Sequence, residues 1–299
     1  MAVAGIFVFA VVGILSGCRP GAEHLEFVAD PARRDIVSVT AGADNFADHT
    51  DVNYRACKTN CARNQLDVYL PDGPAVGTIV FFHGGGFEGG SKELVIVMGM
   101  IKSQTERGWV VVTPNYRLAR PTFASSRNRI IADATAALRW TRSKPAVDMG
   151  VPTGAPLVVA GHSAGGTIAG LLATTITDGS IDGWVSISGI LDWTVGPNSS
   201  AVADVLHADG AHGPSPVELL TADTPPGYMV HGDQDDVVEF FNLAAAGSAT
   251  LEAGAPNLTF DLVDRTANGT SLGYARGHIP VGGANTTRFN SWLDDRLDS

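Results

Sequence analysis

The residues that suggest chemistry most directly form the pentapeptide GHSAG at 161–165. An apolar run at 157–160 precedes it, and a helix-forming stretch follows it. A tight corner between strand and helix would hold the Ser163 hydroxyl in a strained, exposed position, and glycine at both ends of the motif would let the two elements approach closely. This G-x-S-x-G pattern is typical of a nucleophilic serine. A small-residue turn with a solvated serine is the plainer interpretation.

A second group of residues could stabilise the negative charge that such a serine creates. Three consecutive glycines, at 84–86, follow the apolar strand that ends at His83. Without side chains, the loop can turn several N–H groups toward one spot, where an acyl-transfer transition state places its oxyanion. We predict that the N–H groups of Gly85, Gly86 and Ala164 form this oxyanion hole. A flexible loop at a strand end is the alternative.

Composition limits the classes of protein that fit. The chain has 299 residues, of which 44% are hydrophobic, and its net charge is −11. This suits one large α/β domain or two smaller ones with a real core. No basic stripe is present, so we expect no nucleic-acid partner.

The first seventeen residues contain no charged side chain. The run is short for a membrane span and suits a signal peptide at 1–17. It ends in LSGC, which resembles the lipobox of bacterial lipoproteins, and this resemblance implies cleavage before Cys18 and lipidation of its thiol. We therefore expect an exported lipoprotein, anchored in a membrane at the cell surface or in the periplasm, with a tether at 18–34. The usual basic residues before the apolar run are missing, and a plain membrane anchor or an ordinary secretion signal are the alternatives.

Two further cysteines, Cys57 and Cys61, are four positions apart. An exported protein can form disulfides, and this spacing places the two Cα atoms within bridging range. We predict a local disulfide, with two free thiols as the alternative. A metal site would need further ligands nearby, and none are evident.

Strands and helices alternate along the chain, which predicts a mostly parallel sheet covered on both faces within a domain at 35–299. The stretch at 194–226 is long, rich in Gly, Pro and Ser, and is a candidate cap over a site. The expected strands are Ile36–Thr40, Gln65–Leu70, Thr78–His83, Trp109–Pro114, Leu157–Ala160, Gly183–Ser188, Gly227–His231 and Leu258–Leu262. The expected helices are Glu93–Arg107, Asn128–Ser143, Ala164–Thr177, Val237–Ala253 and Asn285–Leu297.

From about Asn64 to its end, the chain resembles the α/β-hydrolase superfamily, and within it the hormone-sensitive-lipase-like and acetyl-esterase-like serine carboxylesterases. The resemblance implies the α/β-hydrolase fold, a mostly parallel sheet of about eight strands with helices on both faces. It also implies cleavage of small carboxylic esters, with short-chain acyl or acetyl groups, through an acyl-enzyme without cofactor or metal. The landmarks occur in family order: "QLDVYLP", "HGGGFEGGSK", "VVTPNYRLA", "DATAALRW", "GHSAGG", "SISGILDW", "PPGYMVHGDQDDVV" and "GH" at 277–278.

The resemblance also assigns the partners of Ser163. In the family the acid follows a strand in a pattern like H-G-x-x-D-x-x-V, which places it here at Asp235; Asp233 and Asp236 are the competing carboxylates. The family's base is a late histidine, and His278 is the last histidine and the only one after Asp235. The resulting chain order of Ser, Asp and His is that of α/β hydrolases.

Other functions on the same scaffold stay open. An amidase, such as a formamidase, or a lipase would use the same residues, and a non-catalytic binding protein could keep the fold. The side chains of Phe87, Phe123 and Trp193 could form the walls of a small substrate pocket or belong to the core. The sequence does not indicate an oligomeric state.

Overall fold

The computed structural model describes residues 47–58, 61–94, 100–120, 126–144, 149–196, 204–206, 213–255, 257–263, 278 and 284–297. The expected signal peptide, Cys18, the tether and the expected strand Ile36–Thr40 lie outside these residues. Within the described residues, no helix is both long and apolar enough to cross a membrane.

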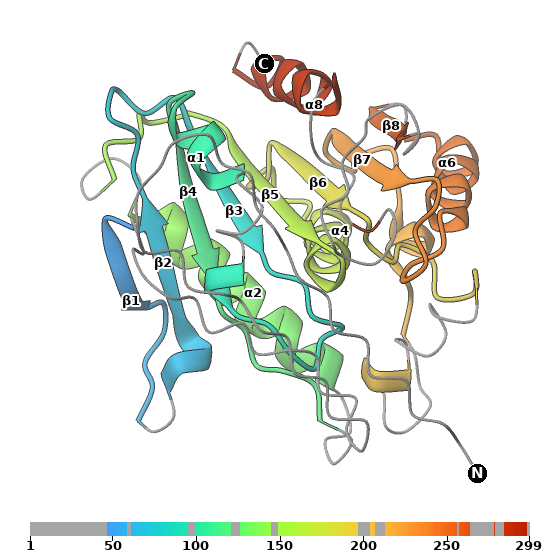
Figure 1. Cartoon of the computed structure of the whole chain (residues 1–299), viewed down its shortest axis with the longest axis horizontal. Helices are drawn as coiled ribbons and strands as arrows, with labels where there is room; N and C mark the ends of the chain where they lie inside the picture. The colour runs from blue at the N-terminus through green and yellow to red at the C-terminus, as the bar shows by residue number, and fades with distance from the viewer. Residues whose placement is uncertain are drawn as a thin grey trace, which may run out of the picture.

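One eight-stranded sheet organises the described chain, in the order β1-β2-β4-β3-β5-β6-β7-β8 (Figure 1). The first two pairings, β1 with β2 and β2 with β4, are antiparallel, and every other pairing is parallel. The fold class expected from the alternating pattern is therefore confirmed. The strands are β1 His49–Asn53, β2 Gln65–Tyr69, β3 Gly77–Phe82, β4 Trp109–Pro114, β5 Leu157–His162, β6 Gly183–Ile187, β7 Gly227–Gly232 and β8 Leu258–Val263.

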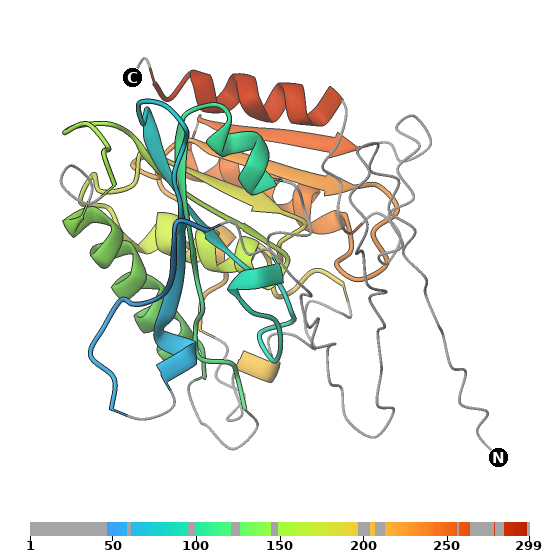
Figure 2. The same cartoon turned by 60° about the vertical axis from the view of Figure 1, so that its left-hand side comes forward.

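Helices cover both faces of this sheet (Figures 1 and 2). The α-helices are α1 Met100–Thr105, α2 Ser126–Ser143, α4 Ala164–Thr175, α6 Phe241–Ala253 and α8 Ala284–Asp294, and two short 3₁₀-helices are η1 Cys61–Asn64 and η3 Pro216–Leu219. Side chains of α2, α4 and α6 share one core cluster, and side chains of α1 and α8 share another on the opposite face.

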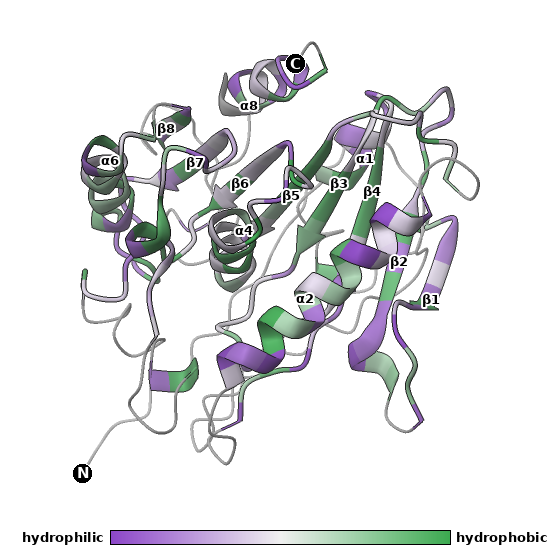
Figure 3. Cartoon of the chain, turned by 180° about the vertical axis from the view of Figure 1, so that it is seen from behind, coloured by the Kyte–Doolittle hydropathy of each residue, from purple (hydrophilic) through white to green (hydrophobic). Residues whose placement is uncertain are grey.

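Alternation along the strands explains the two clusters. In β3, Val80 and Phe82 point into the cluster under α2 and α4, whereas Ile79 and Phe81 point into the cluster under α1 and α8. A strand buried on both faces must be largely apolar at successive positions, and β3, β4 and β5 are drawn mostly in the hydrophobic colour (Figure 3). α4 is buried from Ala164 to Thr174 because it lies against the centre of the sheet.

The strands predicted from residue 65 onward coincide with observed strands to within a residue or two. The edge strand β1 was not predicted, because its sequence HTDVN is polar and mostly exposed and so lacks an alternating pattern. The expected helix Glu93–Arg107 is described only in part, as α1 preceded by a short turn.

The predicted helix Val237–Ala253 was wrong at its start, since α6 begins at Phe241. The backbone N–H groups of Val237 and Val238 bond instead to the Asp235 carboxylate, at 2.9 Å each. The carbonyl of Val238 accepts a bond from the His231 ring at 2.8 Å. The N–H of Asn242 donates to the carbonyl of Glu239 at 3.0 Å, whereas an α-helix through this segment would bond it to the carbonyl of Val238. The segment before Phe241 is therefore a turn.

Part of the candidate cap at 194–226 is visible as packed structure. The indole N–H of Trp193 donates to the carbonyl of Gly213 at 3.2 Å, and Arg127 on α2 donates to the carbonyl of Pro214 at 2.8 Å. The N–H of Val217 donates to the carbonyl of Leu191 at 3.1 Å. Residues 213–226 thus continue the core beside α2 and α4, while 197–203 and 207–212 lie outside the described residues.

A disulfide joins Cys57 to Cys61, with the two Cα atoms 5.6 Å apart. It closes the short loop between β1 and η1. Residues of η1 also contact the rest of the fold, since the carbonyl of Ala62 accepts a bond from the Asn115 amide at 2.9 Å.

We expect Cys57→Ser to lower the free energy of unfolding by about 2 kcal/mol, because the bridge removes loop-closure entropy from the unfolded chain. Urea denaturation under oxidising conditions measures the difference. In excess dithiothreitol the two proteins should unfold at the same urea concentration. A difference that persists in reductant would show that the bridge is not its cause.

Candidate functional site

The site lies where parallel strands end at the same edge of the sheet. His83 follows β3, Ser163 follows β5, and Asp235 follows β7. The carboxyl ends of parallel strands point in one direction, so loops distant in sequence meet there. His278 joins this group from the segment between β8 and α8.

Ser163 occupies the strained corner that the pentapeptide predicted. Its backbone has φ 53° and ψ −121°, a conformation that is costly for a residue with a side chain. Its N–H donates to the carbonyl of Ile187 at 2.8 Å, which fixes the corner to the end of β6. A Cβ on Gly161 would collide with the Gly165 backbone, and a Cβ on Gly165 would collide with the Phe82 carbonyl. Both glycines are therefore required by close approach.

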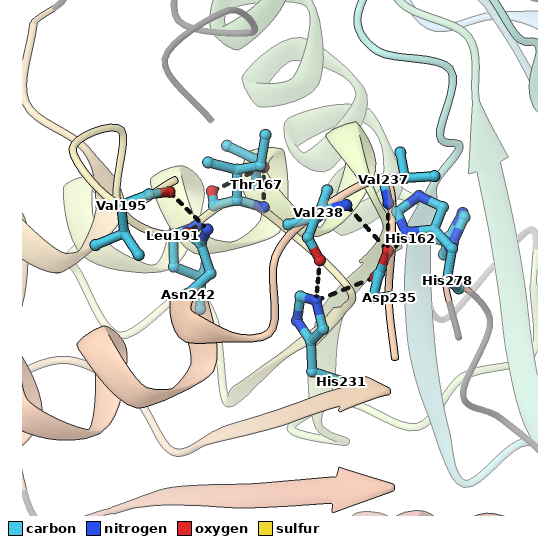
Figure 4. Close-up of polar contacts among 11 residues, drawn as sticks. His162, Thr167, Leu191, Val195, His231, Asp235, Val237, Val238, Asn242 and His278 are labelled. Carbon is cyan, nitrogen blue, oxygen red and sulfur yellow. Dashed lines mark hydrogen bonds and ion pairs between the residues drawn. The ribbon is translucent and has the colours of Figure 1, made fainter. Parts of the chain in front are cut away.

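The carboxylate of Asp235 accepts hydrogen bonds at both of its oxygens (Figure 4). Oδ1 accepts the N–H groups of Val237 and Val238, at 2.9 Å each. Oδ2 lies 2.8 Å from Nδ1 of His278 and 3.1 Å from Nε2 of His231. The Asp235 side chain is almost fully buried. The structure thus brings Asp235 and His278 together, as the sequence resemblance implied.

The two competing carboxylates are placed differently. Asp236 is exposed, and Asp233 is half-buried at the end of β7, where its N–H donates to the carbonyl of Val263 at 3.1 Å. Burial raises the pKa of the Asp235 carboxyl, but the hydrogen bonds from His231 and His278 outweigh it and hold that pKa below its usual range. Asp235 is therefore ionised at neutral pH, as a group that orients a histidine must be.

His231 supports the turn that carries Asp235. Its Nε2 lies 2.8 Å from the carbonyl of Val238 and 3.1 Å from Oδ2 of Asp235. Both partners are acceptors, so Nε2 carries the proton and its N–H is shared between them. The ring thereby holds the carboxylate against the turn.

His162 has a contact that sequence reasoning missed. Its Nε2 lies 2.7 Å from the backbone carbonyl oxygen of His278, and the two ring centroids are 4.7 Å apart. Burial, followed by the neighbouring His278, lowers the pKa of His162 to about 3. The ring is therefore neutral. Because its partner is a backbone oxygen far along the chain, no residue pattern could have revealed the contact.

The glycine loop after β3 lies beside Ser163. A Cβ on Gly84 would lie 3.3 Å from the Cβ of Ser163. The backbone of Gly85 has φ 119° and that of Gly86 has φ 58°, values that favour glycine. The carbonyl of Gly85 accepts the N–H of Gly89 at 2.9 Å, which closes the loop into a turn. The loop and Ala164, the first residue of α4, thus flank Ser163.

His83 and Tyr116 stabilise this loop through hydrogen bonds and ring stacking. The Nδ1 of His83 lies 2.7 Å from the carbonyl of Gly84, and burial lowers the pKa of the ring to about 4, so the neutral ring donates Nδ1–H. The ring stacks on Tyr116 with centroids 4.2 Å apart, and the Tyr116 hydroxyl donates to the carbonyl of His83 at 2.8 Å.

Two cations behind the loop were not anticipated. Arg63 of η1 donates to the carbonyl of Gly90 at 2.6 Å. Lys92 is buried, and its Nζ lies within 3.0 Å of three carboxylates, those of Asp51, Asp67 and Glu93. A buried cation needs such partners, and these pairs join the loop to β1 and β2.

The predicted pocket residues are buried in the core. Phe87 is 1% exposed and Trp193 is 6% exposed, and both belong to the cluster under α2 and α4. Their role as pocket walls stays a prediction, and Phe123 lies outside the described residues. Within the described ranges, no three His, Cys, Asp or Glu side chains gather as metal ligands would.

Solved structures similar to this chain share its architecture. A truncated carbohydrate esterase from gut microbiota superposes with a TM-score of 0.70 at 20% identity, covering 86% of this chain and 99% of the other. Inhibited esterase B from Lactobacillus rhamnosis superposes with a TM-score of 0.65 at 17% identity, covering 84% and 85%. Esterase 2 of Thermogutta terrifontis, phosphonylated by sarin, superposes with a TM-score of 0.63 at 20% identity, covering 84% and 92%.

The chain has the α/β-hydrolase fold. The fold implied by the resemblance of "HGGG", "GHSAGG" and the other landmarks is thereby confirmed. A family model, BD-FAE, matches residues 66–205 of the chain, a range that includes the glycine loop and Ser163. Among curated proteins, no relative matches the chain.

The bonds to Asp235 predict how stability depends on pH. Its pKa is lower in the folded than in the unfolded protein, so its contribution is complete above about pH 4, the ordinary value for Asp, and is lost as pH falls further. Asp235→Asn should therefore be less stable than wild type at pH 6, by a margin that shrinks toward pH 3. Urea denaturation at each pH measures this. The exposed Asp236→Asn is the control, and a margin independent of pH would contradict the assignment.

Proposed function

We propose that this α/β hydrolase is a serine esterase that cleaves small carboxylic esters through an acyl-enzyme. The observation that carries the proposal is the buried contact between Asp235 and His278, at 2.8 Å, at the sheet edge where Ser163 is held in a strained turn. The similar structures are those of esterases, which supports the same chemistry.

In the proposed reaction, Ser163 is the nucleophile and His278 is the general base. The Nδ1–H of His278 donates to Asp235, which leaves Nε2 as an acceptor for the serine proton. As Ser163 attacks the ester carbonyl, the imidazole becomes charged, and the Asp235 carboxylate stabilises it without taking the proton. His278 then protonates the leaving alcohol, and water repeats these steps on the acyl-enzyme.

The oxyanion of each tetrahedral intermediate is assigned to the backbone N–H groups of Gly85, Gly86 and Ala164. The positive φ values of both glycines turn their peptide planes in a way that residues with side chains rarely adopt. Ala164 is the first residue of α4, so its N–H lies at the positive end of the helix dipole. Donors fixed before the reaction cost no reorganisation when charge develops.

Short-chain acyl or acetyl groups are the proposed substrates. An amidase or a lipase would use the same three residues, and the similar structures, which are those of esterases, favour an ester substrate. A non-catalytic protein would have no need to keep Asp235 buried and bonded to His278.

Ser163→Ala should lower kcat by at least about 10³-fold, because the acyl-enzyme can no longer form. A series of p-nitrophenyl esters, from acetate to decanoate, together with acetylated xylan and p-nitroacetanilide, measures activity and preference. Wild type should be fastest on acetate or butyrate and slow on the anilide. A variant within tenfold of wild type would show that another serine is the nucleophile.

Asp235→Asn should lower kcat by about 10⁴-fold, the loss seen in serine proteases when the equivalent change favours the wrong histidine tautomer. Asp233→Asn and Asp236→Asn should retain most of the activity, because the structure shows neither bonded to His278. All three variants are measured on p-nitrophenyl acetate. If Asp233→Asn or Asp236→Asn shows the large loss of kcat instead, the catalytic acid has been misassigned.

Export as a lipoprotein belongs to the same proposal. It is supported by the uncharged apolar run at 1–17 and by the LSGC sequence that ends at Cys18. A diacylated, N-acylated terminus would anchor the enzyme stably, since two or more acyl chains suffice for this.

Cys18→Ala should abolish lipid modification and prevent cleavage before position 18. The full-length gene is expressed in a bacterium with lipoprotein processing, and mass spectrometry of the N-terminal peptide identifies the modification. Wild type should carry acyl chains on Cys18 in the membrane fraction. An unmodified N-terminus at another position would overturn the lipoprotein assignment.

A further inference from the structure

The ring of His162 lies between the three parts of the proposed site. It is adjacent in sequence to Ser163, and its Nε2 lies 2.7 Å from the backbone carbonyl of His278. Its Nδ1 faces the glycine loop, because a Cβ placed on Gly84 would lie 2.9 Å from that atom. One side chain therefore contacts the loop of the proposed oxyanion hole and the backbone of the proposed base.

The contact fixes the tautomer of the ring. A backbone carbonyl can only accept, so Nε2 of His162 must carry the proton and Nδ1 must be bare. The titratable groups around the ring are His278, Asp235 and His231, and His162 is 9% exposed. Burial and the proximity of His278 keep His162 neutral, with a pKa of about 3, so this tautomer persists at every pH at which His278 could act as a base.

The bond is made to the backbone of His278, which matters for the rest of that residue. Asp235 holds the imidazole of His278 through Nδ1, at 2.8 Å. That bond alone leaves the ring free to pivot with its backbone. The second bond, from His162 to the carbonyl oxygen of the same residue, fixes the backbone from which that side chain extends. Together the two bonds hold His278 at its ring and at its backbone, beside Asp235 and His162 (Figure 4).

We infer that His162 is a positioning residue, which holds the backbone of His278 in register with Ser163 through its Nε2–H. This inference rests on the proposed function, since it concerns the same reaction. The ring makes no proton transfer of its own: Nε2–H stays bonded to the carbonyl throughout the cycle.

Its loss should reduce the rate of the chemical step and leave substrate binding almost unchanged. Misplacing a catalytic group by about 1 Å can cost about 10²-fold in rate. A residue that served only as packing would change stability, and every substitution of similar volume would have the same effect on kcat.

The matched pair His162→Gln and His162→Met separates these roles. The Gln amide places an N–H donor near the position of Nε2, whereas Met has a similar shape without a donor. On p-nitrophenyl acetate, we expect the Met variant to lose about 10²-fold in kcat with KM within about threefold of wild type. The Gln variant should recover at least about tenfold of that loss. Equal losses in both variants, or a Met variant with the wild-type kcat, would overturn the inference.

Ser163→Ala, measured in the same assay, distinguishes a failure of this inference from a failure of the proposed function. An inactive Ser163→Ala together with a fully active Met variant overturns only the role of His162.

A measurement on the wild type covers the case in which the variants do not fold. In ¹⁵N-histidine-labelled protein, the His162 ring should show protonated Nε2 and bare Nδ1 from pH 5 to 8. Titration in this range, or the opposite tautomer, would contradict the inference.

Discussion

The buried carboxylate of Asp235 is the group on which the arrangement of the site depends. A charge removed from water is costly unless hydrogen bonds replace the lost hydration. Here the N–H groups of its own turn satisfy Oδ1, and the rings of His231 and His278 satisfy Oδ2. The turn, the end of β7 and the segment before α8 must therefore all be in place for this charge to be stable. The interaction that orients the proposed base is also one that holds three parts of the chain together.

The sheet supplies the frame for this interaction. Parallel strands β3, β5 and β7 end at one edge, so the glycine loop, the serine turn and the acid turn meet there although they are far apart in sequence. Close packing then fixes their spacing. A Cβ on Gly165 would collide with the Phe82 carbonyl at the end of β3, and a Cβ on Gly84 would lie only 3.3 Å from the Cβ of Ser163. Neutral histidines complete the frame, since His83 braces the glycine loop and His162 holds the backbone of His278.

Much of the sheet and of the candidate site could be predicted from sequence, because these features require particular residue types. Strands buried on both faces must be largely apolar, and this pattern predicts β3, β5 and β7. The serine turn and the glycine loop are predictable because their close backbone contacts and positive φ values need glycine. The features that were not predicted depend on contacts or exposure that residue type alone does not specify. The edge strand β1 is polar because it is exposed. The start of α6 was placed too early because the carbonyl of Val238 accepts a bond from the distant His231 ring, and the N–H of Asn242 donates to the carbonyl of Glu239. The contacts of His162 and Arg63 are made to backbone oxygens, and a sequence carries no record of such acceptors.

The central claim is that Asp235 and His278 activate Ser163, and labelling with a fluorophosphonate tests it most directly. Such a reagent reacts with an activated serine and leaves a stable adduct. The labelled protein is digested, and mass spectrometry locates the adduct. The account predicts a single adduct, on the peptide that contains Ser163, and labelling that is slowed strongly by Asp235→Asn and hardly at all by Asp236→Asn. An adduct on another serine, such as the buried Ser188 after β6, or no adduct on folded wild-type protein, would contradict it.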